Sequence, residues 1–293
     1  MIDLLEGLVI SHLGQGIAVE VNDQFYLCHP RRKLETVAVG DRVKIEVTGP
    51  DQGRIEAILP RRSLLKRPAR NQKTRPVAAN IDSVYIVFAS EPSCDFLLLD
   101  QFLAICENNS LNATLVHNKT DLPINAEMEQ ELQDYKKLGY RLLKVSAHSK
   151  MGLKELQQSL ENRVTILTGQ SGVGKSTLSN TLLPDKFLKT NAISDISKLG
   201  RHTTTAATLY HLPSGGDLID SPGVAIFGLA DLTEHQLAWG FREFQPLLNQ
   251  CQFNDCRHVI DKGCMVREAA ESGQISLKRY QRFLKLRQKM PSS

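Results

Sequence analysis

The 293-residue sequence contains no apolar run that approaches the roughly 20 residues needed to cross a bilayer. Residues 1–6 lack the basic start of a secretory signal peptide, so we expect a cytoplasmic protein. The absence of heptad repeats argues against a coiled coil and favours a monomer. A net charge of only +4 excludes a uniformly cationic protein, so any affinity for nucleic acid must come from local clusters.

The composition, 41% hydrophobic and 23% charged, is that of an ordinary globular protein with two or three domains. The first 59 residues predict short strands separated by turn residues, at 8–10, 17–21, 24–27, 42–47 and 55–59. Five short strands in so small a segment predict an OB-type β-barrel. Such barrels either bind nucleic acid or act as rigid spacers, and composition does not decide between these roles.

Residues 60–76 are strongly basic, contain no acidic residue and include three prolines. A solvated interdomain linker would have this composition. Charges of one sign at this density also favour contact with a polyanion, so we expect a linker that touches RNA.

Strand and helix patterns alternate between residues 81 and 168, which predicts an open, mostly parallel, doubly wound α/β sheet. Ligands of such sheets bind beyond the carboxyl ends of the strands. We expect three domains, with a barrel and basic linker at 1–68, the α/β domain at 69–232 and a helical C-terminal domain at 233–293.

Residues 169–176 read Gly-x-x-x-x-Gly-Lys-Ser, the phosphate-binding P-loop. An apolar, β-branched strand at 164–168 precedes the loop and a potential helix at 177–183 follows it, as the motif requires. Lys175 would reach the β- and γ-phosphates and Ser176 would ligate Mg²⁺. The nucleotide-binding residues expected here are Gly169, Gln170, Ser171, Gly172, Val173, Gly174, Lys175, Ser176 and Thr177.

A second motif, Asn-Lys-x-Asp, follows a predicted strand and comprises Asn118, Lys119, Thr120 and Asp121. The Asp121 carboxylate can accept hydrogen bonds from the N1–H and amino groups of guanine, whereas adenine offers no proton at N1. Because an unpaired carboxylate is costly, this residue should select GTP over ATP. Ser146 and Ala147 follow the next strand, where a backbone N–H could meet the guanine O6.

Two further stretches are typical of the switches of a GTPase. The Gly-Arg-His-Thr-Thr-Thr sequence at 200–205 offers hydroxyls for Mg²⁺, from any of three threonines. Asp220 and Gly223 form an Asp-x-x-Gly motif, in which the aspartate would hold Mg²⁺ through water and the glycine N–H would sense the γ-phosphate. The base-recognition motifs precede the P-loop here, so the domain is predicted to be a circularly permuted GTPase.

The C-terminal segment contains Cys251, Cys256, His258 and Cys264. Three thiolates and one imidazole complete a tetrahedral Zn²⁺ shell of the structural kind, and unrelated surface thiols are the alternative. A helix around 277–289 carries six basic residues with no acidic partner along the helix, which favours a face that contacts phosphate over a merely solvated one. Its packed side is expected to comprise Leu277, Tyr280, Phe283 and Leu284.

Together the barrel, the permuted motifs, the 200–205 sequence and the Cys-Cys-His-Cys cluster resemble the RsgA (YjeQ) family across essentially the whole chain. The resemblance implies a GTP hydrolase that binds the small (30S) ribosomal subunit and its 16S rRNA, assists late maturation and is stimulated by the subunit. It also implies one structural Zn²⁺, with Mg²⁺ bound alongside GTP. The alternatives are a P-loop ATPase or kinase, which Asp121 argues against, and a GTP-dependent RNA-binding or translation factor unrelated to assembly.

Water activation requires a separate hypothesis. Val224 follows the Asp-x-x-Gly motif, where many GTPases carry a glutamine that orients water, so intrinsic hydrolysis should be slow. His202 is the candidate catalytic residue, because the family has a histidine in this context and an imidazole can accept a proton from water. An exposed loop histidine without a role is the alternative.

Overall fold

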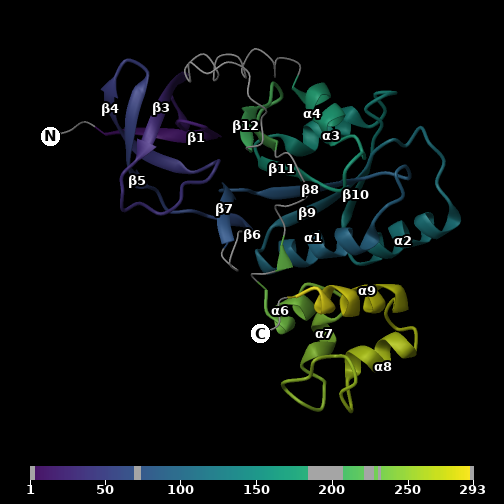
Figure 1. Ribbon diagram of the computed structural model, residues 1–293. Coiled ribbons are helices and arrows are strands. Elements are labelled where there is room, and N and C mark those ends of the chain that lie inside the picture. The colour runs from purple at the N-terminus through teal and green to yellow at the C-terminus, as the bar shows by residue number, and fades with distance from the viewer. Residues whose placement is uncertain (1–3, 69–73, 184–206, 221–227, 230–231, 291–293) are drawn as a thin grey trace.

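The computed structural model describes residues 4–68, 74–183, 207–220, 228–229 and 232–290. Three parts follow one another along the chain in Figure 1, with the strand-rich N-terminal part at upper left and the helical C-terminal part at the bottom. Within the described ranges, every helix is too short or too polar to span a membrane.

The N-terminal part is a closed five-stranded barrel. Its strands are β1 (Leu5–Leu13), β2 (Gly16–Val21), β3 (Gln24–Pro30), β4 (Arg42–Gly49) and β5 (Gln52–Ile58). Strand β1 pairs with both β2 and β4, and the circuit closes through the β2–β3, β3–β5 and β5–β4 pairs. Alternate residues such as Val9, Val19 and Ile45 fill the interior. The barrel predicted from the sequence is confirmed.

The basic segment after the barrel is not an irregular linker. It forms a hairpin of β6 (Leu64–Pro68) and β7 (Thr74–Ala79), so the expected domain boundary at residue 68 falls between two paired strands. The Arg61 guanidinium donates to both carboxylate oxygens of the fully buried Asp41, at 2.7 Å each. Part of the positive charge in this segment therefore ties the hairpin to the barrel.

The central part is the predicted parallel sheet with helices on both faces. Its strand order is β10 (Arg141–Lys144), β9 (Asn112–His117), β8 (Ser83–Phe88), β11 (Val164–Thr168), β13 (Asp217–Asp220) and the antiparallel β12 (Thr208–His211). Helices α1 (Phe96–Asn108) and α2 (Ala126–Lys137) cover one face, and α3 (Leu153–Leu160) and α4 (Lys175–Leu182) cover the other. Strand β11 lies in the middle although three parallel strands precede it in sequence.

The barrel and the central sheet are continuous, which the sequence analysis did not predict. Strand β1 pairs with β12 at Ser11 and Thr208, whose hydroxyl oxygens lie 2.9 Å apart. The Ser11 hydroxyl also donates to the Ala207 carbonyl at 3.2 Å. Since β12 neighbours β13, this joint connects the barrel to the strand that ends at Asp220.

An ion-pair cluster around His211 strengthens the same joint. The imidazole bonds Asp217 and, across the boundary, Glu20 of the barrel, at 2.6 Å each. The hydrogen bonds to Asp217 and Glu20 raise the pKa of His211 to about 10. This histidine is therefore protonated at neutral pH.

We expect stability to depend on pH through this histidine. Because the folded-state pKa of His211 is raised, its ion pairs contribute fully to folding stability below the unfolded pKa of about 6.5. This contribution is lost as the pH rises through about 10. The difference in thermal midpoint between the parent and His211→Gln should therefore be constant below pH about 6.5 and shrink toward pH about 10. His29→Gln, at an exposed barrel position, is the control; a difference independent of pH would contradict the assignment.

The C-terminal part is built from α6 (Glu234–Trp239), α7 (Gln245–Leu248), α8 (Met265–Glu271) and α9 (Leu277–Gln288). Phe241, Phe244 and Phe283 form its aromatic core, with ring centroids 4.9 to 5.6 Å apart. In Figure 1, α9 runs beneath α1 of the central part. Tyr280 and Phe283 are buried as expected, whereas Leu277 is half-exposed and does not belong to the packed side.

Four of the six basic residues of α9 have acidic partners in other segments, which corrects the expectation of a helix without acidic partners. Arg279 is 1% exposed and pairs with Asp100 of α1 and with Glu243. Arg282 bonds Asp100 at 2.5 Å and Glu131 of α2 at 2.8 Å. Lys278 and Arg287 also have partners, Glu127 and Glu234 respectively. Four of the six cations of α9 therefore pair with acids of this protein. Because those acids lie far away in sequence, the pairing was not visible along the helix.

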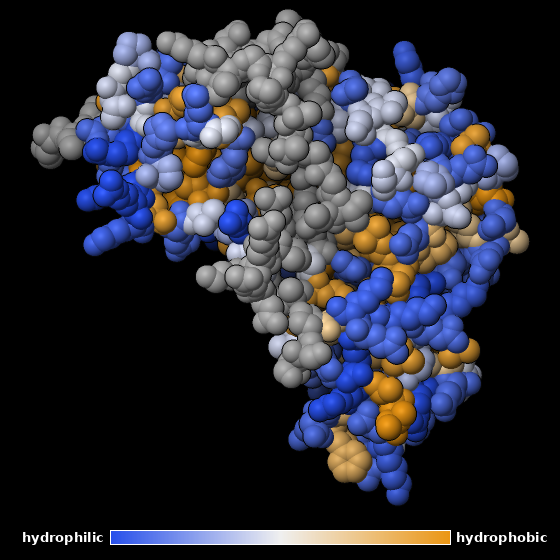
Figure 2. Space-filling view, in the orientation of Figure 1, coloured by the Kyte–Doolittle hydropathy of each residue, from blue (hydrophilic) through white to orange (hydrophobic). Residues whose placement is uncertain are grey.

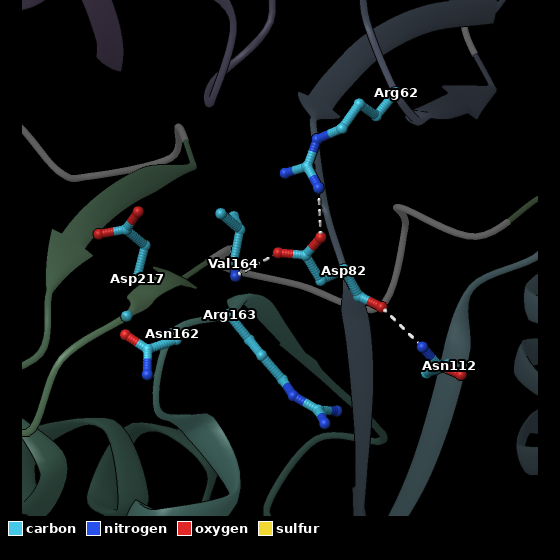
Figure 3. Close-up of a pocket in the computed structure, with 8 residues that line it drawn as sticks. Arg62, Asp82, Asn112, Asn162, Arg163, Val164 and Asp217 are labelled. Atoms are coloured by element: carbon cyan, nitrogen blue, oxygen red, sulfur yellow. Dashed lines mark hydrogen bonds and ion pairs between the residues drawn. The ribbon is translucent and has the colours of Figure 1, made fainter.

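A polar cavity of about 550 Å³ opens at the amino ends of the strands, the edge opposite the P-loop (Figure 3). Both acidic side chains of the cavity already have hydrogen-bond partners. Asp82 accepts from Arg62 at 2.8 Å and from the Val164 N–H at 2.9 Å, and Asp217 bonds His211. We assign no ligand to this cavity.

Candidate nucleotide-binding site and metal centre

The P-loop connects β11 to the N-terminus of α4, so its backbone N–H groups and the helix dipole meet at one place. Gly169 has φ 137°, and a β-carbon on it would lie 1.9 Å from the Val87 carbonyl oxygen. Gly174 has φ 92°, and its β-carbon would lie 2.4 Å from the Asn118 amide nitrogen. Both positions therefore require glycine, because any side chain would push neighbouring parts of the site apart.

The Lys175 ammonium is held inside the loop. It donates to the carbonyls of Gly169 at 2.8 Å and Gln170 at 2.6 Å. Burial lowers the pKa of Lys175, and the Asp220 carboxylate opposes that shift. Ser176 and Thr177, the next two residues, are exposed at the start of α4, where a phosphate and its metal ion would be reached.

The Asn-Lys-x-Asp motif is bound to the P-loop by direct contacts. The buried Asn118 side chain donates to the Val173 carbonyl at 2.9 Å and accepts from the Ala147 N–H at 3.2 Å. One side chain thus connects three predicted motifs, on the turns after β9, β10 and β11. The sequence predicted these residues at strand ends, and the structure brings them together.

The Asp121 side chain is exposed and held by a hydrogen bond from the segment after β10. Its carboxylate accepts from the Ser146 hydroxyl at 2.5 Å, and this bond lowers the pKa of Asp121. Thr120, beside it, donates its hydroxyl to the Val145 carbonyl at 2.9 Å. Asp121 is therefore ionised and fixed in place, while its exposed side remains open to a ligand.

A segment that the sequence analysis missed completes the loop. Lys119 donates to the carbonyls of Glu91 at 2.8 Å and Gly172 at 2.9 Å. The Gln170 amide accepts from the Asp95 N–H and donates to the Ser93 carbonyl, at 2.8 and 2.9 Å. Backbone groups of residues 91–95 make three of these four bonds, so no side-chain pattern could have indicated them.

Asp220 is the last residue of β13, which neighbours β11, and its negative charge raises the pKa of Lys175. This is the position expected of the carboxylate in an Asp-x-x-Gly motif. Gly223, His202 and the threonines at 203–205 lie outside the described residues, so their predicted roles stay predictions.

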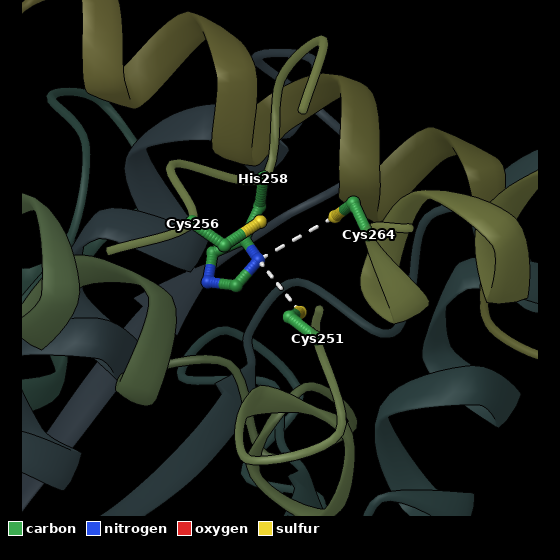
Figure 4. A group of neighbouring side chains, drawn as sticks. All are labelled: Cys251, Cys256, His258 and Cys264. Atoms are coloured by element: carbon green, nitrogen blue, oxygen red, sulfur yellow. Dashed lines mark hydrogen bonds between the residues drawn. The ribbon is translucent and has the colours of Figure 1, made fainter. Parts of the chain in front are cut away.

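The four predicted metal ligands lie together in the C-terminal part (Figure 4). The sulfur atoms of Cys251, Cys256 and Cys264 and a ring nitrogen of His258 all lie within 4.8 Å of one another. His258 Nδ1 is 3.6 Å from Cys251 Sγ and 3.5 Å from Cys264 Sγ. Metal bonds of about 2.0–2.3 Å at tetrahedral angles place neighbouring ligand atoms roughly 3.5–3.8 Å apart. This cluster could hold a metal ion.

The surroundings fix this cluster firmly. Tyr280 of α9 donates its hydroxyl to the His258 carbonyl at 2.9 Å, and the Arg267 N–H donates to Cys264 Sγ at 3.4 Å. Burial raises the pKa of the Cys256 thiol, and a bound dication would stabilise the thiolate instead.

We expect Cys256→Ser to release the metal and destabilise residues 249–267, because metal binding and folding are coupled in such sites, at about 10–16 kcal/mol in small zinc domains. Elemental analysis gives the metal content, and fluorescence of Trp239, the chain's one tryptophan, follows unfolding of this part in urea. Cys94→Ser, outside the cluster, should change neither. A parent protein without stoichiometric metal would contradict the prediction.

Comparisons with known proteins agree with this geometry. The family model described as RsgA GTPase matches residues 58–230. The small ribosomal subunit biogenesis GTPase RsgA of Chromohalobacter salexigens is 44% identical, over 94% of this chain and 84% of that protein. The protein of that name from Hahella chejuensis is 42% identical, over 97% and 84%.

Two solved structures share the whole architecture. YjeQ from Thermotoga maritima superposes with a TM-score of 0.75 at 31% identity, covering 97% of each chain. YloQ, described as a circularly permuted GTPase, has a TM-score of 0.73 at 26% identity and covers 99% of this chain and 98% of that one. With the family model matching more than half of the chain and relatives matching nearly all of it, the protein belongs to the RsgA GTPase family of GTP hydrolases.

Proposed function

We propose that this GTPase acts in biogenesis of the small ribosomal subunit, hydrolysing GTP when it is bound to the particle. The observation that carries the proposal is an ionised, exposed Asp121 bonded to Ser146 at the P-loop edge, in a chain with biogenesis GTPases as relatives over nearly its whole length. The same names support the small subunit as partner, and we propose its 16S rRNA as the contacted component.

The residues proposed to bind GTP have distinct tasks. Asp121 selects guanine, Asn118 aligns the base loop with the P-loop, and the 169–174 backbone surrounds the phosphates. Lys175 stabilises charge on the transferred phosphoryl group, and Ser176 would ligate Mg²⁺. Asp220 and Gly223 are proposed as the second-switch contacts. Orientation and charge stabilisation by these groups supply the catalysis, because little covalent chemistry is required of the protein.

The metal of the Cys3His cluster is proposed to be Zn²⁺, since three sulfur ligands and one imidazole with no open position favour a structural zinc site. A cytoplasmic, monomeric protein remains our expectation. We keep the domain boundaries at 1–68, 69–232 and 233–293 as part of the proposal.

We propose that His202 orients the attacking water when the subunit docks. His202→Ala should leave GTP affinity nearly unchanged and lower subunit-stimulated hydrolysis about a hundredfold, the typical contribution of a positioned acid or base. Single-turnover hydrolysis with purified small subunits measures this, with His29→Ala, at an exposed barrel position, as control. Full stimulated turnover in His202→Ala would remove the residue from the mechanism.

Co-sedimentation separates assembly from other RNA-linked roles. The GTP-bound protein should sediment with immature small subunits in preference to free RNA of equal mass. Equal binding to both would favour the alternative, a GTP-dependent RNA-binding or translation factor.

A further inference from the structure

The barrel joins the central sheet in register with Asp220. Ser11 of β1 lies opposite Thr208 of β12, and Thr208 lies opposite Asp220 of β13. Asp220 in turn is the register partner of Leu167, two residues before the P-loop begins at Gly169. Four neighbouring strands thus carry these residues in one line from the barrel to the phosphate-binding loop. In Figure 1, β12 lies between the barrel and the other strands of the central sheet.

Buried hydroxyl groups make the contact at this joint. Ser11 is 3% exposed and Thr208 is 5% exposed. Because the Ser11 hydroxyl gives its single proton to the Ala207 carbonyl, the Thr208 hydroxyl is the donor of the 2.9 Å bond between the two side chains. Directly opposed residues of an antiparallel pair have their side chains on the same face, so Thr208 also lies beside Asp220. One threonine therefore lies between a barrel side chain and the end of β13.

The barrel is held firmly against the central sheet around this pair. Ile10 of β1 shares a buried cluster with Leu209 of β12 and Ile219 of β13. The Asn80 amide, after β7, donates to the Gly40 carbonyl, before β4, at 2.9 Å. In Figure 2 the outer edge of the barrel, at left, is blue, whereas its orange side chains lie toward the central part. A displacement of the barrel therefore passes directly to β12.

Strand β12 depends on this support because it is short and lies at the end of the central sheet. It has four residues, and among the strands that the structure describes only β1 pairs with its outer edge. The next strand, β13, also has four residues and carries Asp220 at its last position. A carboxylate at the end of so short a strand takes its position from the strands beside it.

We propose that Ser11 and Thr208 are positioning residues for Asp220, so that the barrel supports the nucleotide site without touching the nucleotide. The hydroxyl pair fixes β12, and β12 fixes the end of β13. Burial lowers the pKa of Lys175 and the Asp220 charge opposes that shift, so the two groups already interact in the nucleotide-free chain. The inference deepens the proposed function and rests on the proposed role of Asp220 in the second switch.

Hydrogen exchange in the nucleotide-free chain tests the positioning itself. Ser11→Ala and Thr208→Val each remove one hydroxyl of the pair and leave the rest of the side chain similar in shape. In both variants the amides of residues 217–220 should exchange about 2- to 10-fold faster than in the parent, as expected for the loss of one hydrogen bond. Thr208→Ser keeps the hydroxyl and should retain the parent rates.

The Mg²⁺ dependence of nucleotide binding tests the consequence at the site. The Mg²⁺ concentration that half-maximally slows dissociation of a fluorescent GDP analogue should rise about tenfold in Thr208→Val, the lower end of the effect of residues that orient a metal site. Affinity measured without Mg²⁺ should equal the parent's, because Asp121 and the P-loop backbone are unchanged. Combining Thr208→Val with Ser11→Ala should add nothing, because the two hydroxyls share one bond.

Ser83→Ala is the matched control for Ser11→Ala. The Ser83 and Thr165 hydroxyls lie 2.8 Å apart and both residues are fully buried. This pair joins β8 to β11 at the amino ends of the strands, away from the P-loop. Thermal unfolding gives the stability of each variant, and the control should lose as much stability as Ser11→Ala. Its exchange at 217–220 and its Mg²⁺ dependence should equal those of the parent.

Two results would overturn the inference. One is a Thr208→Val variant with the parent's Mg²⁺ dependence while Asp220→Asn is impaired. The other is a Ser83→Ala variant that changes both readouts as much as Ser11→Ala does, because general weakening of the sheet would then explain them. Failure of the proposed role of Asp220 has a separate sign, which is an Asp220→Asn variant with the parent's Mg²⁺ dependence. The exchange rates would then decide whether the pair positions β13.

Discussion

Replacing Asp121 by asparagine should lower the affinity for GTP about a hundredfold or more and raise the affinity for xanthosine triphosphate. The carboxylate is positioned by Ser146 and exposed on its other side, so it can accept from both the N1–H and the amino group of guanine. Each hydrogen bond to a charged group is worth about 1.5–3 kcal/mol, and the amide replaces an acceptor by a donor. Xanthine carries an oxo group where guanine carries the amine, which suits that donor.

Equilibrium titration with fluorescent GTP and XTP analogues measures both affinities. Asp134→Asn, at a partly exposed carboxylate on α2 of the same domain, is the control and should retain the parent's preference. If Asp121→Asn binds GTP as well as the parent does, Asp121 does not recognise the base.

Arg279→Met should destabilise the C-terminal part by about 3–5 kcal/mol, the typical cost of leaving a buried charge without its partner. Arg279 is 1% exposed. Its loss leaves Glu243 without its paired cation and removes one of the cations that pair with the buried Asp100 carboxylate. Tyr135, which donates its hydroxyl to Asp100 at 2.5 Å, does not replace a charge. Because Asp100 belongs to α1, the substitution should also loosen α9 from the central sheet.

Urea unfolding followed by Trp239 fluorescence reports on this part alone, because the chain has a single tryptophan. Lys278→Met is the matched control: Lys278 adjoins Arg279 on α9, but its pair with Glu127 is solvent-exposed and screened, so its loss should change stability far less. Equal effects of the two substitutions would mean that the Arg279 cluster does not hold the domains together.

Local patterns in the sequence predicted most of the elements and the residues of the two candidate ligand-binding clusters. Alternation of apolar and polar residues predicted the barrel strands, because each of these strands has one face in the core. The P-loop, Asn118 to Asp121 and Ser146 follow strands that proved to be parallel neighbours, so their convergence at one edge could be expected. The metal ligands converge because they lie within 14 residues of one another.

Contacts between distant segments could not be predicted in this way. The acids that pair with Arg279 and Arg282 lie on α1, α2 and the segment between α6 and α7, so α9 read by itself presented only unpaired cations. The same holds for the joint between β1 and β12, where a single pair, Ser11 with Thr208, links residues 197 positions apart. Burial and pairing decide the role of a charge, and neither is visible in a local window.

Stimulation by the ribosomal particle is measured as GTP hydrolysis by the full chain with and without purified small ribosomal subunits. We expect slow hydrolysis by the protein alone, since Val224 cannot orient water, and stimulation of at least about tenfold by small subunits but not by large ones. Equal rates with and without small subunits would contradict activation by the particle. Hydrolysis of ATP as fast as GTP would contradict the assignment of GTP as the substrate.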